Sequence, residues 1–169
     1  MYHVGLFEGI GGFSLAARWA GLNSEISCEI DEDCRDVLKS NFPNTTLFED
    51  VKKLTKETFD EILISKYGEN YGEQMLLTGG FPCQPFSYSG NRGGASDNRY
   101  LWPEMLRIIK SVRPRWVIGE NVAGLLTMVL PPEASAMGNS SYYREGVLFN
   151  IIKNLVKAEY DVQTFVIPA

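Results

Sequence analysis

The sequence has no apolar run long enough to cross a membrane, for which about 18 consecutive residues are needed. Its N-terminus also lacks a charged segment followed by an apolar stretch, which is the pattern of a secretory signal peptide. We therefore expect a cytoplasmic protein with no membrane partner.

Cysteine and histidine are scarce. The cysteines are Cys28, Cys34 and Cys83, no two of them form a C-x-x-C pair, and His3 is the only histidine. A small, odd number of cysteines argues against a disulfide framework, and a single histidine argues against a zinc site. We expect no metal, and we interpret Cys28 and Cys34 as buried, inert thiols.

The distribution of charge gives two opposing indications. The net charge of −5 argues against a nucleic-acid partner. Between residues 84 and 119, however, six basic residues stand against only two acidic ones. Basic segments of this kind are more often solvated surfaces than binding sites, so this one is of interest only because it begins beside Cys83.

Strand-like and helix-like segments alternate along the 169 residues, of which 44% are hydrophobic. The predicted strands are residues 2–6, 25–28, 45–48, 74–78, 115–119 and 162–167. The predicted helices are residues 13–20, 31–41, 55–67, 102–112 and 142–158, and residues 128–141 are predicted to form a loop. This alternation predicts one α/β domain with a doubly wound, mostly parallel sheet.

Acidic, glycine and cysteine residues follow the predicted strands. Glu8 follows the first strand, Glu29 the second, Asp50 the third, residues 79–84 the fourth and Glu120 the fifth. The carboxyl ends of parallel strands meet at one edge of the sheet, where ligands bind in such folds. The pattern therefore predicts a single ligand-binding edge.

A glycine-rich turn, FEGIGG, separates the first predicted strand from the first predicted helix. Glycines there allow a tight turn and a close approach of a ligand to the backbone. Glu29, about 20 residues further on, can hold ribose hydroxyls, and Asp50 can accept a hydrogen bond from an adenine amino group. The turn predicts an adenosine cofactor without choosing between a dinucleotide and S-adenosylmethionine, and a purely structural turn is the alternative.

Cys83 stands between Pro82 and Gln84-Pro85 at the end of the fourth predicted strand. A packing cysteine does not need this rigid, protruding setting, whereas a nucleophile does. Glu120 leaves the apolar fifth strand, where poor solvation is expected to raise its pKa and allow it to donate a proton. For Glu120 alone, a capping or solvated carboxylate is an equally good interpretation.

The chain resembles the cytosine-5 DNA methyltransferases in the order and spacing of its motifs. FEGIGG resembles motif I, GFPCQ motif IV and ENV motif VI, at residues 7–12, 80–84 and 120–122. Likenesses to motifs II, III, V and VII cover Glu29, Asp50, Asp97, Arg99, Leu101 and residues 147–169. The resemblance runs from end to end and implies a Rossmann-like fold of the S-adenosylmethionine-dependent methyltransferase type.

The resemblance also implies methyl transfer from S-adenosylmethionine to carbon 5 of cytosine in double-stranded DNA, within a restriction–modification system. The implied catalytic residues are Cys83, Glu120 and Arg99. The implied cofactor-binding residues are Phe7, Gly9, Ile10, Gly11, Gly12, Glu29, Ile30, Asp50, Val51, Pro82 and Leu101. The implied substrate-binding residues are Phe81, Gln84, Ser87, Asn121 and Val122.

The implied mechanism explains why a thiol and a carboxylic acid occur together. Carbon 5 of cytosine is too weak a nucleophile to take a methyl group until the Cys83 thiolate attacks carbon 6. Glu120 would stabilise the charge that develops on the ring through a hydrogen bond at nitrogen 3. The base must be flipped out of the duplex, with residues 86–99 as a lid and Arg99 contacting the base or a phosphate.

Two features depart from the family pattern. Gly5 stands where many members carry an acid or a serine, which would alter the methionine end of the cofactor pocket. The sequence stops at Ala169, before a Gln-x-Arg-x-Arg motif, the target-recognition region and the final motif. We therefore expect residues 1–169 to be the N-terminal part of a catalytic domain, with little activity unless a C-terminal half or a partner chain supplies the rest.

Three other functions remain open. A cytosine-5 enzyme that acts on transfer RNA can use the same motifs, and a non-catalytic module can bind cofactor or DNA without turnover. A dinucleotide-dependent oxidoreductase is supported by the glycine turn alone. In a prokaryote, a DNA-modifying enzyme is expected at the nucleoid.

Overall fold

The structure, a computed structural model, describes residues 1–82, 100–129 and 146–167. The chain divides into two compact units. The first unit comprises Met1–Phe81 and Pro103–Glu120, and it contains the β-sheet. The second comprises Pro82–Trp102 and Asn121–Ala169, so that it includes the residues that the structure does not describe.

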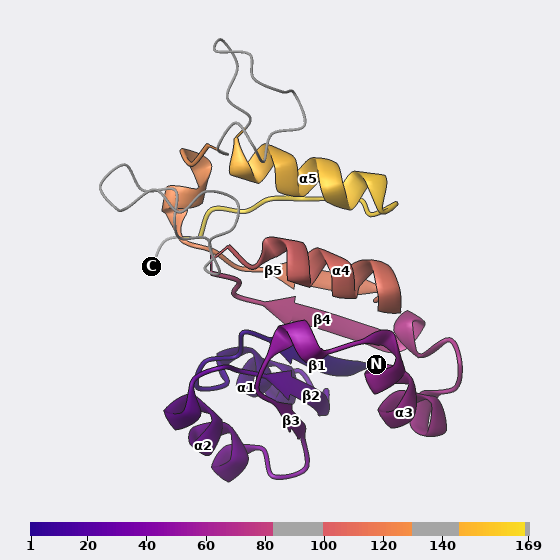
Figure 1. Cartoon of the computed structure of the whole chain (residues 1–169). Helices are drawn as coiled ribbons and strands as arrows, with labels where there is room; N and C mark the ends of the chain where they lie inside the picture. Colours follow the sequence, from indigo (N-terminus) through magenta and orange to yellow (C-terminus); the bar gives the residue numbers. More distant parts are fainter. Residues whose placement is uncertain (83–99, 130–145, 168–169) are drawn as a thin grey trace. The chain divides into compact units, whose positions relative to one another are not determined.

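The sheet has five parallel strands in the order β3-β2-β1-β4-β5 (Figure 1). The strands are β1 (Tyr2–Leu6), β2 (Ser24–Cys28), β3 (Thr46–Phe48), β4 (Met75–Gly79) and β5 (Trp116–Gly119). Strand β1 is central and buried along its whole length, as expected for a strand covered on both faces. The predicted doubly wound parallel sheet is confirmed.

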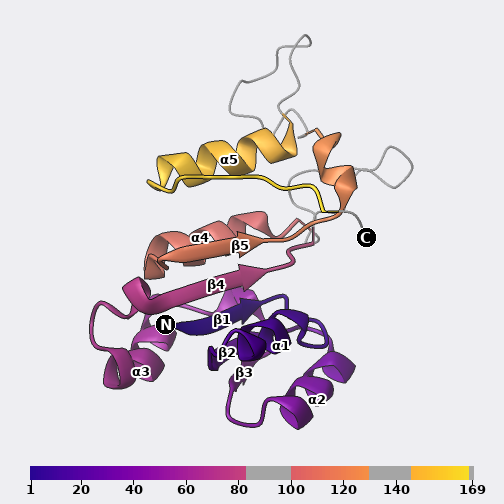
Figure 2. The same cartoon turned by 180° about the vertical axis from the view of Figure 1, so that it is seen from behind.

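Four helices connect these strands: α1 (Gly12–Trp19), α2 (Glu32–Asn41), α3 (Lys56–Tyr67) and α4 (Trp102–Val112). The chain moves outward from β1 to β3 and then crosses back to β4 and β5. Because such crossovers are right-handed, α1 and α2 cover one face of the sheet and α3 and α4 the other (Figures 1 and 2).

Local sequence signals explain where these helices begin. The Asp31 side chain accepts a hydrogen bond from the Cys34 N–H and caps α2, and Thr55 forms a capping box with Thr58 at the start of α3. The apolar sides of α3 and α4 are buried, with Phe59 and Met105 fully enclosed. The predicted strands and helices up to residue 119 lie within about one residue of the observed bounds. Two short 3₁₀ helices, η1 (Val51–Lys53) and η2 (Tyr71–Gln74), were not predicted.

The second unit differs more from the sequence prediction. It contains η3 (Ala123–Leu126), α5 (Val147–Lys157) and an isolated bridge between Val129 and Gly146. The helix predicted over 142–158 begins at Val147 in the described part, whereas 142–145 and residues 130–141 of the predicted loop lie outside it. The strand predicted over 162–167 is wrong, because this segment pairs with no strand among the described residues.

A candidate site at the carboxyl edge of the sheet

The first unit places the glycine turn and the first residues of two other predicted motifs, Gly80 and Glu120, at one edge of the sheet. Between β1 and β4 the winding of the chain reverses, and Leu6 pairs with Gly79 at the carboxyl ends of these strands. Gly79 pairs on its other side with Gly119, and the Glu120 N–H donates to the Gly79 carbonyl at 3.0 Å. The segments that follow β1, β4 and β5 therefore leave the sheet side by side, where ligands bind in folds of this kind.

The glycine turn after β1 is tightly packed on its inner side and open on its outer side. Phe7, Gly9 and Gly11 have φ angles of 55°, 54° and 93°, all in the left-handed region. A Cβ at Gly11 would lie 2.7 Å from the Phe42 ring, so that both backbone angle and space require glycine there. A Cβ at Gly9 or Gly12 would meet nothing within 4 Å, which leaves the turn accessible to a ligand.

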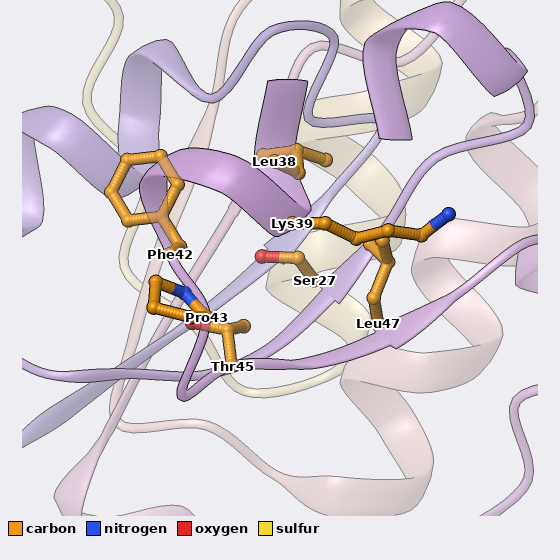
Figure 3. Close-up of a pocket in the computed structure, with 7 residues that line it drawn as sticks. All are labelled: Ser27, Leu38, Lys39, Phe42, Pro43, Thr45 and Leu47. Carbon is orange, nitrogen blue, oxygen red and sulfur yellow. The ribbon is translucent and has the colours of Figure 1, made fainter. Parts of the chain in front are cut away.

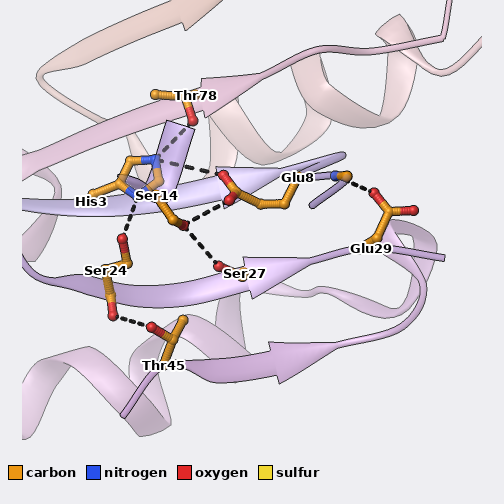
Figure 4. Close-up of polar contacts among 9 residues, drawn as sticks. His3, Glu8, Ser14, Ser24, Ser27, Glu29, Thr45 and Thr78 are labelled. Atoms are coloured by element: carbon orange, nitrogen blue, oxygen red, sulfur yellow. Dashed lines mark hydrogen bonds and ion pairs between the residues drawn. The ribbon is translucent and has the colours of Figure 1, made fainter. Parts of the chain in front are cut away.

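Glu29 links the end of β2 to this turn. Its Oε2 accepts a hydrogen bond from the Gly9 N–H at 2.7 Å (Figure 4). Its Oε1 accepts one from the Asp31 N–H at 2.9 Å. Each carboxylate oxygen keeps further acceptor capacity for ribose hydroxyls. Ile10 and Ile30 are 68% and 71% exposed, so that apolar side chains next to Gly9 and Glu29 are available to cover a planar base.

Asp50 lies beyond the end of β3, as predicted. Its Oδ1 caps η1 by accepting a hydrogen bond from the Lys52 N–H at 2.9 Å. Val51 is buried, and its carbonyl accepts a hydrogen bond from Arg107 Nη2 at 3.0 Å, while the Leu54 carbonyl accepts one from Nη1 at 2.7 Å. The α4 guanidinium therefore holds the segment that presents Asp50.

Glu120 lies over the segment that leads toward Cys83. A Cβ at Gly80 would be 3.2 Å from Glu120 Oε2, so the carboxylate occupies the space that the glycine leaves free. Glu120 is exposed, and the poor solvation expected for it is wrong. The physical reason is that β5 is an edge strand in the sheet that the described residues form, and Trp116 and Ile118 on it are also exposed.

Several predicted site residues lie in the second unit or outside the described residues. Phe81 is buried at the end of the first unit, Pro82 is exposed, and the Pro82 carbonyl accepts a hydrogen bond from the Leu101 N–H at 3.2 Å. Asn121 Oδ1 accepts a hydrogen bond from the N–H of Val122, which is 62% exposed. Outside the described residues lie Cys83, Gln84, Ser87, Asp97, Arg99 and the predicted lid over 86–99.

The other two cysteines are poor nucleophiles. Cys28 is buried, and burial raises the pKa of its thiol to about 12. Cys34 is partly exposed, so its predicted burial is wrong, but partial desolvation and the neighbouring Asp31 raise its pKa as well. The thiolate is the reactive form of cysteine, and a raised pKa lowers the fraction of thiolate. Neither Cys28 nor Cys34 is therefore activated as a nucleophile.

A buried polar cluster beneath the glycine turn was missed by the sequence analysis. It joins β1, β2, β4 and α1 through His3, Glu8, Ser14, Ser27 and Thr78 (Figure 4). The signal in the sequence that indicates it is His3, a histidine inside an otherwise apolar strand. This cluster supports the turn from its inner side.

A separate cavity of about 140 Å³ lies between α2 and the β2–β3 side of the sheet (Figure 3). Its lining residues are Ser27, Leu38, Lys39, Phe42, Pro43, Thr45 and Leu47. None of them is a predicted site residue, so this cavity is not the candidate site. In the part of the chain that the structure describes, no helix is long and apolar enough to span a bilayer, and no group of three potential ligands is arranged for a metal ion.

Comparison with known families agrees with this geometry. The model of the family described as C-5 cytosine-specific DNA methylase matches residues 1–169. The chain belongs to this family. The same match supports the S-adenosylmethionine-dependent methyltransferase type of fold that the motifs implied.

Relatives of this methylase chain include bacterial type II methyltransferases. It is 40% identical to M.PspPI of Psychrobacter sp. over 123 residues, which cover 72% of this chain and 27% of that protein. It is 34% identical to M.Sau96I of Staphylococcus aureus over 121 residues, covering 71% of this chain and 26% of the relative. With M.AquIA of Picosynechococcus sp., 33% identity extends over 125 residues, which are 49% of that protein. The chain thus matches between about a quarter and a half of the length of these relatives.

Solved structures show the same fold. A protein of an Escherichia coli prophage, described as a DNA modification methyltransferase, superposes with a TM-score of 0.65 at 24% identity, covering 93% of this chain and 38% of that one. The Dnmt2 methyltransferase of S. pombe superposes with a TM-score of 0.57 at 25% identity, covering 76% of this chain and 38% of the other.

Proposed function

We propose that this chain is the cofactor-binding and catalytic part of a DNA (cytosine-5)-methyltransferase of a type II restriction–modification system. The observation that carries the proposal is the convergence, at one edge of the sheet, of the glycine turn, the strand that leads to Cys83, and Glu120. Membership of the family and the names of the relatives support the reaction class.

The described residues fit an S-adenosylmethionine molecule. The open outer side of the turn at Gly9 and Gly12 admits a ligand close to the backbone, and Glu29 offers acceptors for a ribose. Exposed Ile10 and Ile30 offer apolar surface to an adenine ring. When bound, this cofactor supplies an electrophilic methyl group carried on a sulfonium.

Catalysis is assigned to residues that leave β4 and β5. The Cys83 thiolate would form a bond to carbon 6 of a flipped cytosine, which makes carbon 5 nucleophilic enough to accept the methyl group. Glu120 would hold ring nitrogen 3 by a hydrogen bond and stabilise the charge that develops there. Loss of the carbon 5 proton and cleavage of the bond to Cys83 then release the product. Arg99 would hold the base or a phosphate.

The extent of the protein is also part of the proposal. Because this chain matches only part of its relatives, we propose that sequence-specific binding of double-stranded DNA requires further residues, in a C-terminal half or a partner chain. We place the enzyme in the cytoplasm, on the DNA it modifies.

The test is covalent trapping with the full-length protein. DNA that carries 5-fluorocytosine throughout is incubated with S-adenosylmethionine, because fluorine at carbon 5 blocks the final elimination and the recognition sequence is unknown. We expect a denaturation-resistant protein–DNA adduct in the wild type and in Cys34→Ala, but none in Cys83→Ala. Glu120→Gln is expected to slow adduct formation by about 100-fold or more.

Other outcomes would select other functions. An adduct with 5-fluorocytosine-containing transfer RNA but not with DNA would assign the reaction to RNA. Binding of S-adenosylhomocysteine without any adduct would indicate a non-catalytic module. Binding of NAD in place of S-adenosylhomocysteine would indicate a dinucleotide-dependent oxidoreductase. An undiminished adduct in Cys83→Ala would exclude Cys83 as the nucleophile.

A further inference from the structure

The side chain of Glu8 folds back from the glycine turn into the protein interior (Figure 4). Glu8 is 5% exposed, and its Oε2 accepts a hydrogen bond from Ser14 Oγ at 2.7 Å. Its Oε1 accepts no hydrogen bond among the described residues and lies 3.9 Å from His3 Nε2. An unpaired polar atom in the interior is costly, so this position requires a structural reason.

Gly5 provides the space for the Glu8 carboxyl group. A Cβ at position 5 of β1 would lie 1.7 Å from Glu8 Oε1 and 2.3 Å from Glu8 Cδ, far inside van der Waals contact. On either side of Glu8, Phe7 and Gly9 have φ angles of 55° and 54°, which reverse the chain and return the side chain over β1. Positions 5 and 8 therefore interlock, because a side chain at position 5 is compatible only with a smaller residue at position 8.

The surroundings of the carboxyl group favour its neutral form. Desolvation by burial raises the pKa of Glu8 to about 7, with the charge of Glu29 adding to the effect. Burial also lowers the pKa of His3 to about 4, and its ring nitrogens are each 2.8 Å from a hydroxyl, Ser24 Oγ and Thr78 Oγ1. At 3.9 Å the carboxyl group and the imidazole are too far apart for a hydrogen bond, and because burial disfavours the charged imidazole, the two groups are neighbours without forming an ion pair.

We propose that Glu8 is a positioning residue for the methyl donor, because its buried carboxyl group, seated over Gly5, holds the glycine turn in the shape that binds the cofactor. The inference rests on the proposed cofactor site. The Glu8 side chain fills the inner side of the turn and is tied to α1 through Ser14, while the turn's outer side remains open at Gly9. The Gly9 N–H is hydrogen-bonded to Glu29, so a displaced Glu8 would also disturb the acceptor proposed for the ribose.

The main chain of Glu8 shows how directly its side chain acts on the turn. Its N–H donates to the Cys28 carbonyl at 3.2 Å, and its carbonyl accepts from the Gly11 N–H at 2.9 Å. The residue that carries the buried side chain thus also closes the turn and joins it to β2. Displacement of the side chain is therefore expected to act on the same residue whose backbone closes the turn.

Reciprocal substitution in the full-length protein tests the inference, with S-adenosylhomocysteine binding measured by titration calorimetry. Gly5→Ala should weaken binding by about ten-fold or more, because the new methyl group expels the Glu8 side chain. Glu8→Ala should weaken binding several-fold, whereas Glu8→Gln, which keeps the shape and cannot ionise, should stay within about two-fold of the wild type. Gly5→Ala/Glu8→Ala should recover most of the affinity that Gly5→Ala loses.

Tyr67→Phe is the matched control for lost stability, since it removes a part-buried hydrogen bond from Tyr67 on α3 to Glu25 in β2 and should leave the affinity unchanged. If Gly5→Ala does not fold, the affinities of Glu8→Ala and Glu8→Gln for S-adenosylhomocysteine still test the positioning role of Glu8. Equal affinity of Glu8→Ala and wild type, or a loss in Glu8→Gln as large as in Glu8→Ala, would overturn the positioning role alone. No binding of S-adenosylhomocysteine by the wild type would overturn the proposed cofactor site and this inference with it.

Discussion

Arg107 connects α4 to the segment that presents Asp50, and its removal has a calculable cost. Its guanidinium donates to the Leu54 carbonyl at 2.7 Å and to the Val51 carbonyl at 3.0 Å, and Nε donates to Glu104. Hydrogen bonds that involve a charged group contribute about 1.5–3 kcal/mol each. The side chain is 39% exposed, so water can replace part of this interaction. We expect Arg107→Ala to lower the free energy of unfolding by about 2–3 kcal/mol.

Urea denaturation, followed by circular dichroism, measures this loss. Lys110→Ala is the matched control, because Lys110 is exposed on the same helix and its removal should change stability by less than about 0.5 kcal/mol. Arg107→Lys keeps the charge but lacks the fork that spans two carbonyls, so we expect it to recover less than half of the loss. If Arg107→Ala proves no more destabilising than Lys110→Ala, the link between α4 and η1 does not stabilise the fold.

Three further substitutions test other features, each by urea denaturation. Gly11→Ala should lower the free energy of unfolding by about 2–4 kcal/mol, because Gly11 has a φ of 93° and the new Cβ would lie 2.8 Å from the Leu38 side chain. Gly12→Ala is the control and should leave the free energy of unfolding nearly unchanged, because a Cβ there meets nothing within 4 Å. Asp31→Ala should cost about 1 kcal/mol through loss of the cap on α2, and an unchanged stability would show that the cap contributes nothing. The folded state raises the pKa of Glu8 from 4.5 to about 7, so ionisation of this group opposes folding. Between pH 4.5 and about 7, the free energy of unfolding of Glu8→Gln should therefore rise relative to that of the wild type by about 1.4 kcal/mol per pH unit. Above pH 7 this difference should stay constant. A difference between these two proteins that does not change with pH would refute the buried, neutral carboxyl group.

The sequence predicted the first unit well because its signals are local. Strands such as Tyr2–Leu6 are short apolar runs, and Asp31 and Thr55 mark the starts of α2 and α3. The order of the strands was not needed to predict that Glu29 and Glu120 lie at one edge, since all carboxyl ends of a parallel sheet meet there. The residues at the carboxyl edge of the sheet could therefore be predicted without knowing the order of the strands.

The remaining features depend on contacts that a linear pattern does not contain. A segment rich in β-branched and aromatic residues, such as 162–167, becomes a strand only if a neighbour pairs with it, and the described residues provide none. The solvation of Glu120 depends on the position of β5 at the edge of the sheet. The burial of Glu8 depends on an absent side chain three positions earlier and on two left-handed residues, neither of which has a periodic signature.

The interlock of Gly5 and Glu8 restricts the order in which mutations can accumulate in this turn. Loss of the Glu8 side chain first leaves a void, which the fold can tolerate at some cost and which a serine or alanine at position 5 can later fill. The reverse order passes through an intermediate in which two side chains compete for the same volume. Directed evolution of this chain should therefore recover substitutions at position 5 only in lineages that have already replaced Glu8.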